Sequence, residues 1–146
     1  MPPADRAISR CQTDTFELSF PPSDEAVGPA RRRFSAWLHR RTDDDVADEL
    51  EVVFSELATN AVNGSPPGAE EVTGRAWYEG ETLVVDITNR IDPAGSPGPA
   101  GSCWDLQDPL RTGGRGLVIA EAFVDSMEVT LEPGQRLVVR CRRRLG

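Results

Sequence analysis

The sequence predicts an α+β domain, a two-layer sandwich in which helices cover one face of a mixed, mainly antiparallel sheet. Two observations support this fold class. Strand-like stretches occur in two close pairs, each joined by a short turn, and such pairs form antiparallel hairpins. Three other stretches have apolar residues at helical spacing, so each predicts a helix that buries one side. The order is strand, two helices, two strands, a long loop, one helix and two strands.

The length and composition fit one globular domain. A chain of 146 residues can bury a substantial core without disulfide or metal support. The content of 38% hydrophobic and 27% charged residues is that of a globular protein and not of a disordered one. Residues 1–12 are polar and aperiodic, so we expect a disordered tail followed by a single domain over residues 13–145.

The charge excludes some classes of function. The formal net charge is −8, which argues against a nucleic-acid partner. All the cationic side chains other than His are Arg, so no lysine can act as a phosphate ligand or nucleophile. No apolar run is long enough to span a bilayer, and residues 1–10 lack the apolar core of a signal peptide. We therefore expect a cytoplasmic protein without a membrane partner.

The three cysteines indicate neither a disulfide framework nor a zinc site. Cys11, Cys103 and Cys141 are widely spaced and include no CxxC pair. We expect reduced thiols.

The first strand and helix follow from alternation and spacing. Residues 15–20 alternate polar and apolar side chains, and Pro21 and Pro22 end the strand. Ser23 or Asp24 can cap an amphipathic helix that ends near Thr42. His39, near the end of this helix, receives no functional role, because a dipole contact or solvation explains it.

The second helix, over residues 43–65, has two different sides. Thr42 or one of the following aspartates caps it. Its core side is apolar and comprises Val46, Leu50, Val53, Phe54, Leu57, Ala61 and Val62. Glu56 and Asn60 lie on the other side, and because they are four residues apart their side chains share one surface. That surface combines a carboxylate that can take a proton with an amide oxygen that can bind a hard cation.

The remaining strands form two hairpins. Residues 72–78 and 82–88 are joined by a tight connection, and residues 127–131 and 136–141 by Glu132-Pro133-Gly134-Gln135. Arg140, Arg142, Arg143 and Arg144 resemble a nucleic-acid patch, but alternation on an exposed strand followed by a charged tail explains them better.

A long aperiodic stretch separates the hairpins. Residues 89–112 are rich in Pro, Gly, Ser and Asp, so this stretch is either disordered or a functional lid. The apolar anchors Trp104 and Leu106 favour a lid. TGGRGLVIAEAF then starts a helix over residues 116–124 with clustered glycines. Such a turn lets backbone N–H groups approach an anion, which predicts a phosphorylated ligand. The pattern is neither a P-loop nor a dinucleotide-binding unit.

The sequence resembles the GHKL superfamily of ATPases and kinases. The resemblance rests on ELATNA in a long helix and on GGRGLVIAEAF, and it extends from about Phe16 to Arg143. Within the superfamily the chain is most similar to the small serine/threonine kinases that act as bacterial anti-sigma factors. It implies a Bergerat-type ATP-binding fold that uses ATP and Mg²⁺, with Glu56 as general base and Asn60 as the metal ligand. The implied ATP-binding residues are Asn60, Asn63, Asn89, Asp92, Thr112, Gly113, Gly114, Arg115, Gly116 and Leu117, of which Gly114, Gly116 and Leu117 form the glycine box that hinges the lid.

Two positions depart from the family pattern. Where relatives end the central strand with an acidic residue that reads the adenine amine, this chain has Asn89, with Asp92 as the second choice. Asparagine can accept that hydrogen bond only without charge. Relatives also have a basic residue one turn after Asn60, where this chain has Asn63-Gly64-Ser65, so Arg111 or Arg115 must supply any positive charge.

The resemblance implies a protein kinase that phosphorylates an anti-anti-sigma partner and sequesters a sigma factor, often as a homodimer. The alternative is a regulatory module that binds its partner in a nucleotide-dependent way without phosphate transfer. The departures favour nucleotide binding over turnover.

Overall fold

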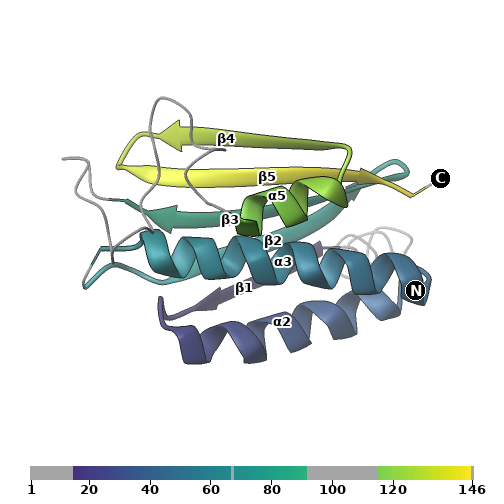
Figure 1. Ribbon diagram of the computed structural model, residues 1–146, viewed down its shortest axis with the longest axis horizontal. Helices are drawn as coiled ribbons and strands as arrows, with labels where there is room; N and C mark the ends of the chain where they lie inside the picture. Colours follow the sequence, from purple (N-terminus) through teal and green to yellow (C-terminus); the bar gives the residue numbers. More distant parts are fainter. Residues whose placement is uncertain (1–14, 67, 92–114, 146) are drawn as a thin grey trace, which may run out of the picture.

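The computed structural model describes residues 15–66, 68–91 and 115–145. Figure 1 shows a sheet with three helices packed on one of its faces, which confirms the predicted two-layer α+β architecture. The elements in chain order are β1 (Thr15–Phe20), α2 (Asp24–His39), α3 (Asp44–Gly64), β2 (Val72–Glu79), β3 (Thr82–Arg90), α5 (Arg115–Ala122), β4 (Ser126–Glu132) and β5 (Arg136–Arg144). Both predicted hairpins are present, with strands slightly longer than the sequence pattern indicates.

The described strands form one five-stranded sheet in the order β1-β2-β3-β5-β4. Every pairing is antiparallel, whereas the sequence predicts a mixed, mainly antiparallel sheet. A single crossover helix between two strands brings the chain back to run parallel to the first strand. Two helices separate β1 from β2, which adds one more reversal, so these two strands run antiparallel. β3 and β4 run in the same direction, but β5 lies between them and pairs with both.

The core lies between the sheet and the two long helices. Six of the seven predicted apolar residues of α3 are buried, and the seventh, Val46, is half-buried. Phe34 of α2 stacks on Phe54 of α3 with ring centroids 4.6 Å apart, and Phe16 of β1 meets Phe34 edge-on. Gly74 of β2 faces the Phe54 ring so closely that an added Cβ would lie 3.1 Å from its Cε2 atom. Aromatic packing therefore joins β1, β2 and both helices.

The helix ends decide between the predicted caps. The Asp43 carboxylate accepts a hydrogen bond from the Val46 amide at 2.9 Å, so Asp43 caps α3. Ser23 occupies the cap position of α2 without a side-chain cap hydrogen bond, and α2 ends at His39, earlier than predicted. None of the described helices combines the length and hydrophobicity needed to cross a bilayer.

The prediction of an exposed C-terminal strand was wrong. β5 lies inside the sheet, and two of its arginines, Arg140 and Arg142, are paired with carboxylates on the neighbouring strands β3 and β4. Arg140 forms two hydrogen bonds of 2.7 Å with Asp86, whose side chain is only 4% exposed. Cys141 is a free thiol, as expected, and burial raises its pKa to about 12. β5 is thus an interior strand in which Arg140 and Arg142 are paired with acidic side chains of the neighbouring strands.

Candidate functional site

The outward side of α3 brings three of the predicted site residues together. Glu56, Asn60 and Asn63 follow one another at about one-turn intervals, and all three are half-buried. The Asn60 Nδ2 atom donates a hydrogen bond of 2.9 Å to the Glu56 carbonyl oxygen. Because the donor half of this amide is engaged with the helix backbone, its Oδ1 atom points away from that carbonyl. The helix therefore presents an amide oxygen next to a carboxylate.

The N-terminal end of α5 lies close to this surface. α3 and α5 pack against each other and run in opposite directions (Figure 1). The end of α5 is placed by Ala122, which together with Glu49 of α3 lines a cavity of about 320 Å³. Seven residues of helix span about 10.5 Å, so stepping from Ala122 back to Arg115 corresponds to stepping from Glu49 forward to Glu56. The start of α5, where the first N–H groups of a helix have no partner within the helix, is thus beside Glu56 and Asn60.

Arg143 holds α5 in this position. Its Nη2 atom lies 2.8 Å from the Glu49 carboxylate on α3, and its Nη1 atom donates a 2.7 Å hydrogen bond to the Phe123 carbonyl just after α5. One guanidinium therefore joins β5, α3 and the C-terminal end of α5. This role of Arg143 was not predicted from the sequence. Arg143 pairs with the buried Leu83 of β3 and so falls on the helix-facing side of the sheet.

Asn89 lies on the same side of the sheet, near the end of β3. It continues the helix-facing series Leu83, Val85 and Ile87, and it is only 2% exposed. Its Nδ2 atom donates to the Arg90 carbonyl oxygen at 3.1 Å, so its Oδ1 atom is the half of the amide left to accept from a ligand. β3 continues to Arg90, two residues beyond the predicted strand end.

Several predicted residues lie outside the described part of the chain. These are Asp92, Thr112, Gly113 and Gly114, together with Arg111 and the predicted lid anchors Trp104 and Leu106. The structure places Arg115, Gly116 and Leu117 in the first turn of α5 but describes only their backbone. Their assignments, and the choice between Asn89 and Asp92 for the base, stay predictions.

The residues present fit a magnesium–phosphate group. An amide oxygen is a ligand that a hard divalent cation accepts, and Asn60 offers one next to the negative charge of Glu56 on the same helix face. The N-terminus of α5 adds partial positive charge and backbone donors suited to phosphate oxygens. The Glu56 and Asn60 surface attracts the cation and the N-terminus of α5 attracts the phosphates, so together they suit a metal–polyphosphate pair.

A second cavity lies beside the ends of β1, β2 and β3, and Asn89 is one of the residues that line it. It measures about 450 Å³ and is lined by Ser19, Glu70, Glu71, Thr73, Thr88, Asn89, Arg90 and Arg136. Glu70 is shared there between Arg90 and Arg136, at 3.3 and 3.7 Å. Glu56 and Asn60 are not among its lining residues, so this cavity is distinct from the surface formed by α3 and α5.

Comparison with known families agrees with this arrangement. The family model described as the histidine kinase-like ATPase domain matches residues 20–142. The match contains every helix and strand from α2 to β4 and most of β5, and therefore every candidate site residue. No curated protein matches the chain. Because the family model covers most of the sequence, the chain belongs to the histidine kinase-like ATPase domain family, within the GHKL superfamily.

Proposed function

We propose that the protein is an ATP-binding regulator of the anti-sigma type, a serine/threonine protein kinase whose substrate is an anti-anti-sigma protein and whose second partner is a sigma factor. The observation that supports this most is the juxtaposition of Glu56 and Asn60 with the start of α5. Family membership makes ATP the expected ligand at that place.

Each residue of the site has a distinct task in this proposal. The Asn60 Oδ1 atom holds the magnesium ion, and the backbone N–H groups from Gly113 to Leu117 hold the phosphates. Asn89 accepts from the adenine amine, with Asp92 as the alternative. Magnesium, when bound, neutralises charge on the phosphate oxygens.

Glu56 is the proposed general base. Its carboxylate takes the proton from the serine or threonine hydroxyl as that oxygen bonds to the terminal phosphorus of ATP and the bond to the β-phosphate oxygen breaks. The half-buried position of Glu56 allows a substrate hydroxyl to reach it while the helix backbone fixes its neighbour Asn60.

Transfer of label tests the kinase directly. Purified protein is incubated with γ-labelled ATP, magnesium and candidate anti-anti-sigma domains, with Glu56→Gln as the matched variant. Label on a partner serine or threonine with the native chain, and much less with Glu56→Gln, supports the kinase. Equal labelling by both proteins would remove Glu56 from the mechanism.

A second candidate is a nucleotide-dependent binding module without phosphate transfer. The chain contains no lysine and has Asn63-Gly64-Ser65 where a cation one turn after Asn60 would help the transferred phosphate. The two candidates separate in the same experiment. ATP-dependent capture of a sigma factor or an anti-anti-sigma domain without any label transfer would favour the module, and sedimentation of the same samples would show whether the active form is a homodimer.

A further inference from the structure

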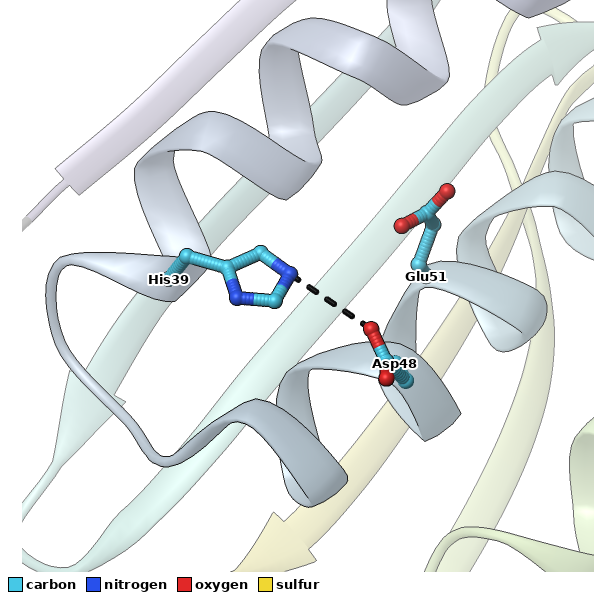
Figure 2. A group of neighbouring side chains, drawn as sticks. All are labelled: His39, Asp48 and Glu51. Atoms are coloured by element: carbon cyan, nitrogen blue, oxygen red, sulfur yellow. Dashed lines mark ion pairs between the residues drawn. The ribbon is translucent and has the colours of Figure 1, made fainter.

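A cluster of one histidine and three carboxylates lies at the junction of α2 and α3, away from the proposed nucleotide site. Figure 2 shows the His39 ring at the end of α2 directed at Asp48 of α3, with Glu51 three residues further along the same helix. One ligand atom from each of these three residues lies within 4.8 Å of the other two. Neither the family match nor the proposed kinase chemistry uses this group.

The imidazole is held in an orientation suited to metal binding. His39 Nδ1 lies 2.9 Å from the Asp44 carboxylate, a distance typical of a hydrogen bond. This bond favours the proton on Nδ1, which leaves the Nε2 lone pair facing Asp48 and Glu51. In many metal sites a carboxylate accepts a hydrogen bond from the histidine nitrogen that does not bind the metal, here Nδ1, and so fixes the orientation of the ring.

The distance between the facing atoms of His39 and Asp48 is close to that between two ligands of one metal ion. His39 Nε2 lies 3.6 Å from Asp48 Oδ1, too long for a strong hydrogen bond. Two ligands bound at about 2.05 Å around a tetrahedral zinc ion lie about 3.3 Å apart. A small rotation of either side chain would reach that separation.

Arg31 is the competing partner of Glu51. Its Nε atom lies 3.5 Å from Glu51 Oε2 and makes no hydrogen bond to any described residue. This contact is therefore a loose ion pair that occupies one of two carboxylate oxygens. The surrounding charge still favours a cation, because three carboxylates face one imidazole and one guanidinium.

We propose that His39, Asp48 and Glu51 form a binding site for a divalent transition-metal ion of the zinc class, with Asp44 as the residue that orients His39. The imidazole nitrogen selects a transition metal over magnesium or calcium, which prefer all-oxygen ligands. The ion joins the end of α2 to α3, the helix that also presents Glu56 and Asn60.

Calorimetric titration with Zn²⁺ alone, at pH 8 and without nucleotide, tests the site. The protein carries Cys11→Ser and Cys103→Ser so that these thiols do not compete. We expect one Zn²⁺ per chain and a loss of at least about tenfold in affinity for His39→Ala and for Asp48→Asn. Asp45→Asn, an exposed carboxylate in the same turn as Asp44, is the matched control and leaves binding unchanged. Arg31→Gln tightens it by freeing Glu51.

A spectroscopic measurement identifies the ligand. His39 is the only histidine, so the ring nitrogen signals in a ¹⁵N NMR spectrum belong to it alone. Zn²⁺ should shift Nε2 while Nδ1 keeps its proton, and Asn60→Ala should not alter the shift. Zn²⁺ binding that is equally strong in His39→Ala, an unshifted His39 ring, or no binding at 100-fold excess metal would each overturn the proposal.

Discussion

The two sides of α3 carry different kinds of information. The inner side is apolar and buried, and its members are fixed by what they pack against, as with Phe54 between Phe34, Phe16 and Gly74. The outer side is polar around Glu56, Asn60 and Asn63, and these residues are half-buried, with the Asn60 amide bonded to the Glu56 carbonyl of its own helix. One helix thus supports the fold with one side and offers its chemistry on the other. Substitutions on the two sides should therefore separate stability from function.

The largest expected effect is on the outer side. Glu56→Gln keeps the size and shape of the side chain but removes its basicity. We expect phosphate transfer to fall by about 10²–10⁴-fold, the usual contribution of a positioned general base. ATP affinity and the midpoint of thermal unfolding should stay the same, which calorimetry on the same preparation checks. A parallel fall in stability would mean that Glu56 supports the fold.

On the inner side of α3 we expect a substitution to reduce stability. Phe54→Ala removes a fully buried ring and leaves a cavity, so we expect the free energy of unfolding to fall by about 3–5 kcal/mol. Val52→Ala, on the outer side and 38% exposed, is the control and should change it by less than about 0.5 kcal/mol. Urea denaturation followed by tryptophan fluorescence measures both. Similar costs for the two variants would contradict the division between the sides.

A substitution of Arg143 tests whether its contact with Glu49 of α3 stabilises the fold as well as the position of α5. Arg143→Ala removes the contact with Glu49 and the hydrogen bond to the Phe123 carbonyl. The guanidinium is partly exposed, so we expect a loss of only about 1–2 kcal/mol in unfolding free energy. ATP affinity should also fall, because the start of α5 loses its support. Arg144→Ala, whose backbone alone bonds Asp125, is the matched control. An unchanged ATP affinity for Arg143→Ala would show that α5 is held by other contacts.

The smallest expected effect concerns recognition of the adenine ring by Asn89. Asn89→Asp replaces a neutral acceptor by a charged one, and about 1 kcal/mol of additional hydrogen-bond energy corresponds to roughly fivefold tighter ATP binding. The gain should be absent for GTP, because an ionised carboxylate accepts from the adenine amine but cannot donate to the guanine keto oxygen. If Asn89→Asp leaves the ratio of ATP to GTP affinity unchanged while Asp92→Asn abolishes ATP binding, Asp92 reads the base.

Most of the fold was predictable because it depends on periodicity. Alternation in residues 15–20 and helical spacing from Val46 to Val62 identify elements whose apolar sides must be buried. The direction of the pairings was less accessible. Nothing local in residues 136–144 reveals that this strand lies between two others, because the decisive contact, Asp86 with Arg140, joins residues far apart in the chain.

The candidate site was predictable only in part, for a related reason. Glu56 and Asn60 share a surface by helix geometry alone, so their spacing is sufficient. Arg143 and the cluster around His39 depend on tertiary packing. The sequence predicts that His39 is solvated or contacts the helix dipole at the end of its helix. In the structure the turn into α3 places the Asp44 carboxylate 2.9 Å from His39 Nδ1.

The strand order has a consequence for how the chain folds. β2–β3 and β4–β5 are local hairpins, whereas the pairing of β3 with β5 closes a long loop and is entropically costly to begin. The pairing of β3 with β5 is therefore expected to form late, as a seam between the β2–β3 hairpin and the β4–β5 hairpin. Asp86 and Arg140 face each other across that seam, and a slip of one residue would turn Arg140 toward the apolar core and leave the Asp86 carboxylate unpaired. The ion pair between the buried Asp86 and the partly exposed Arg140 thus acts as a check on the alignment of the two hairpins.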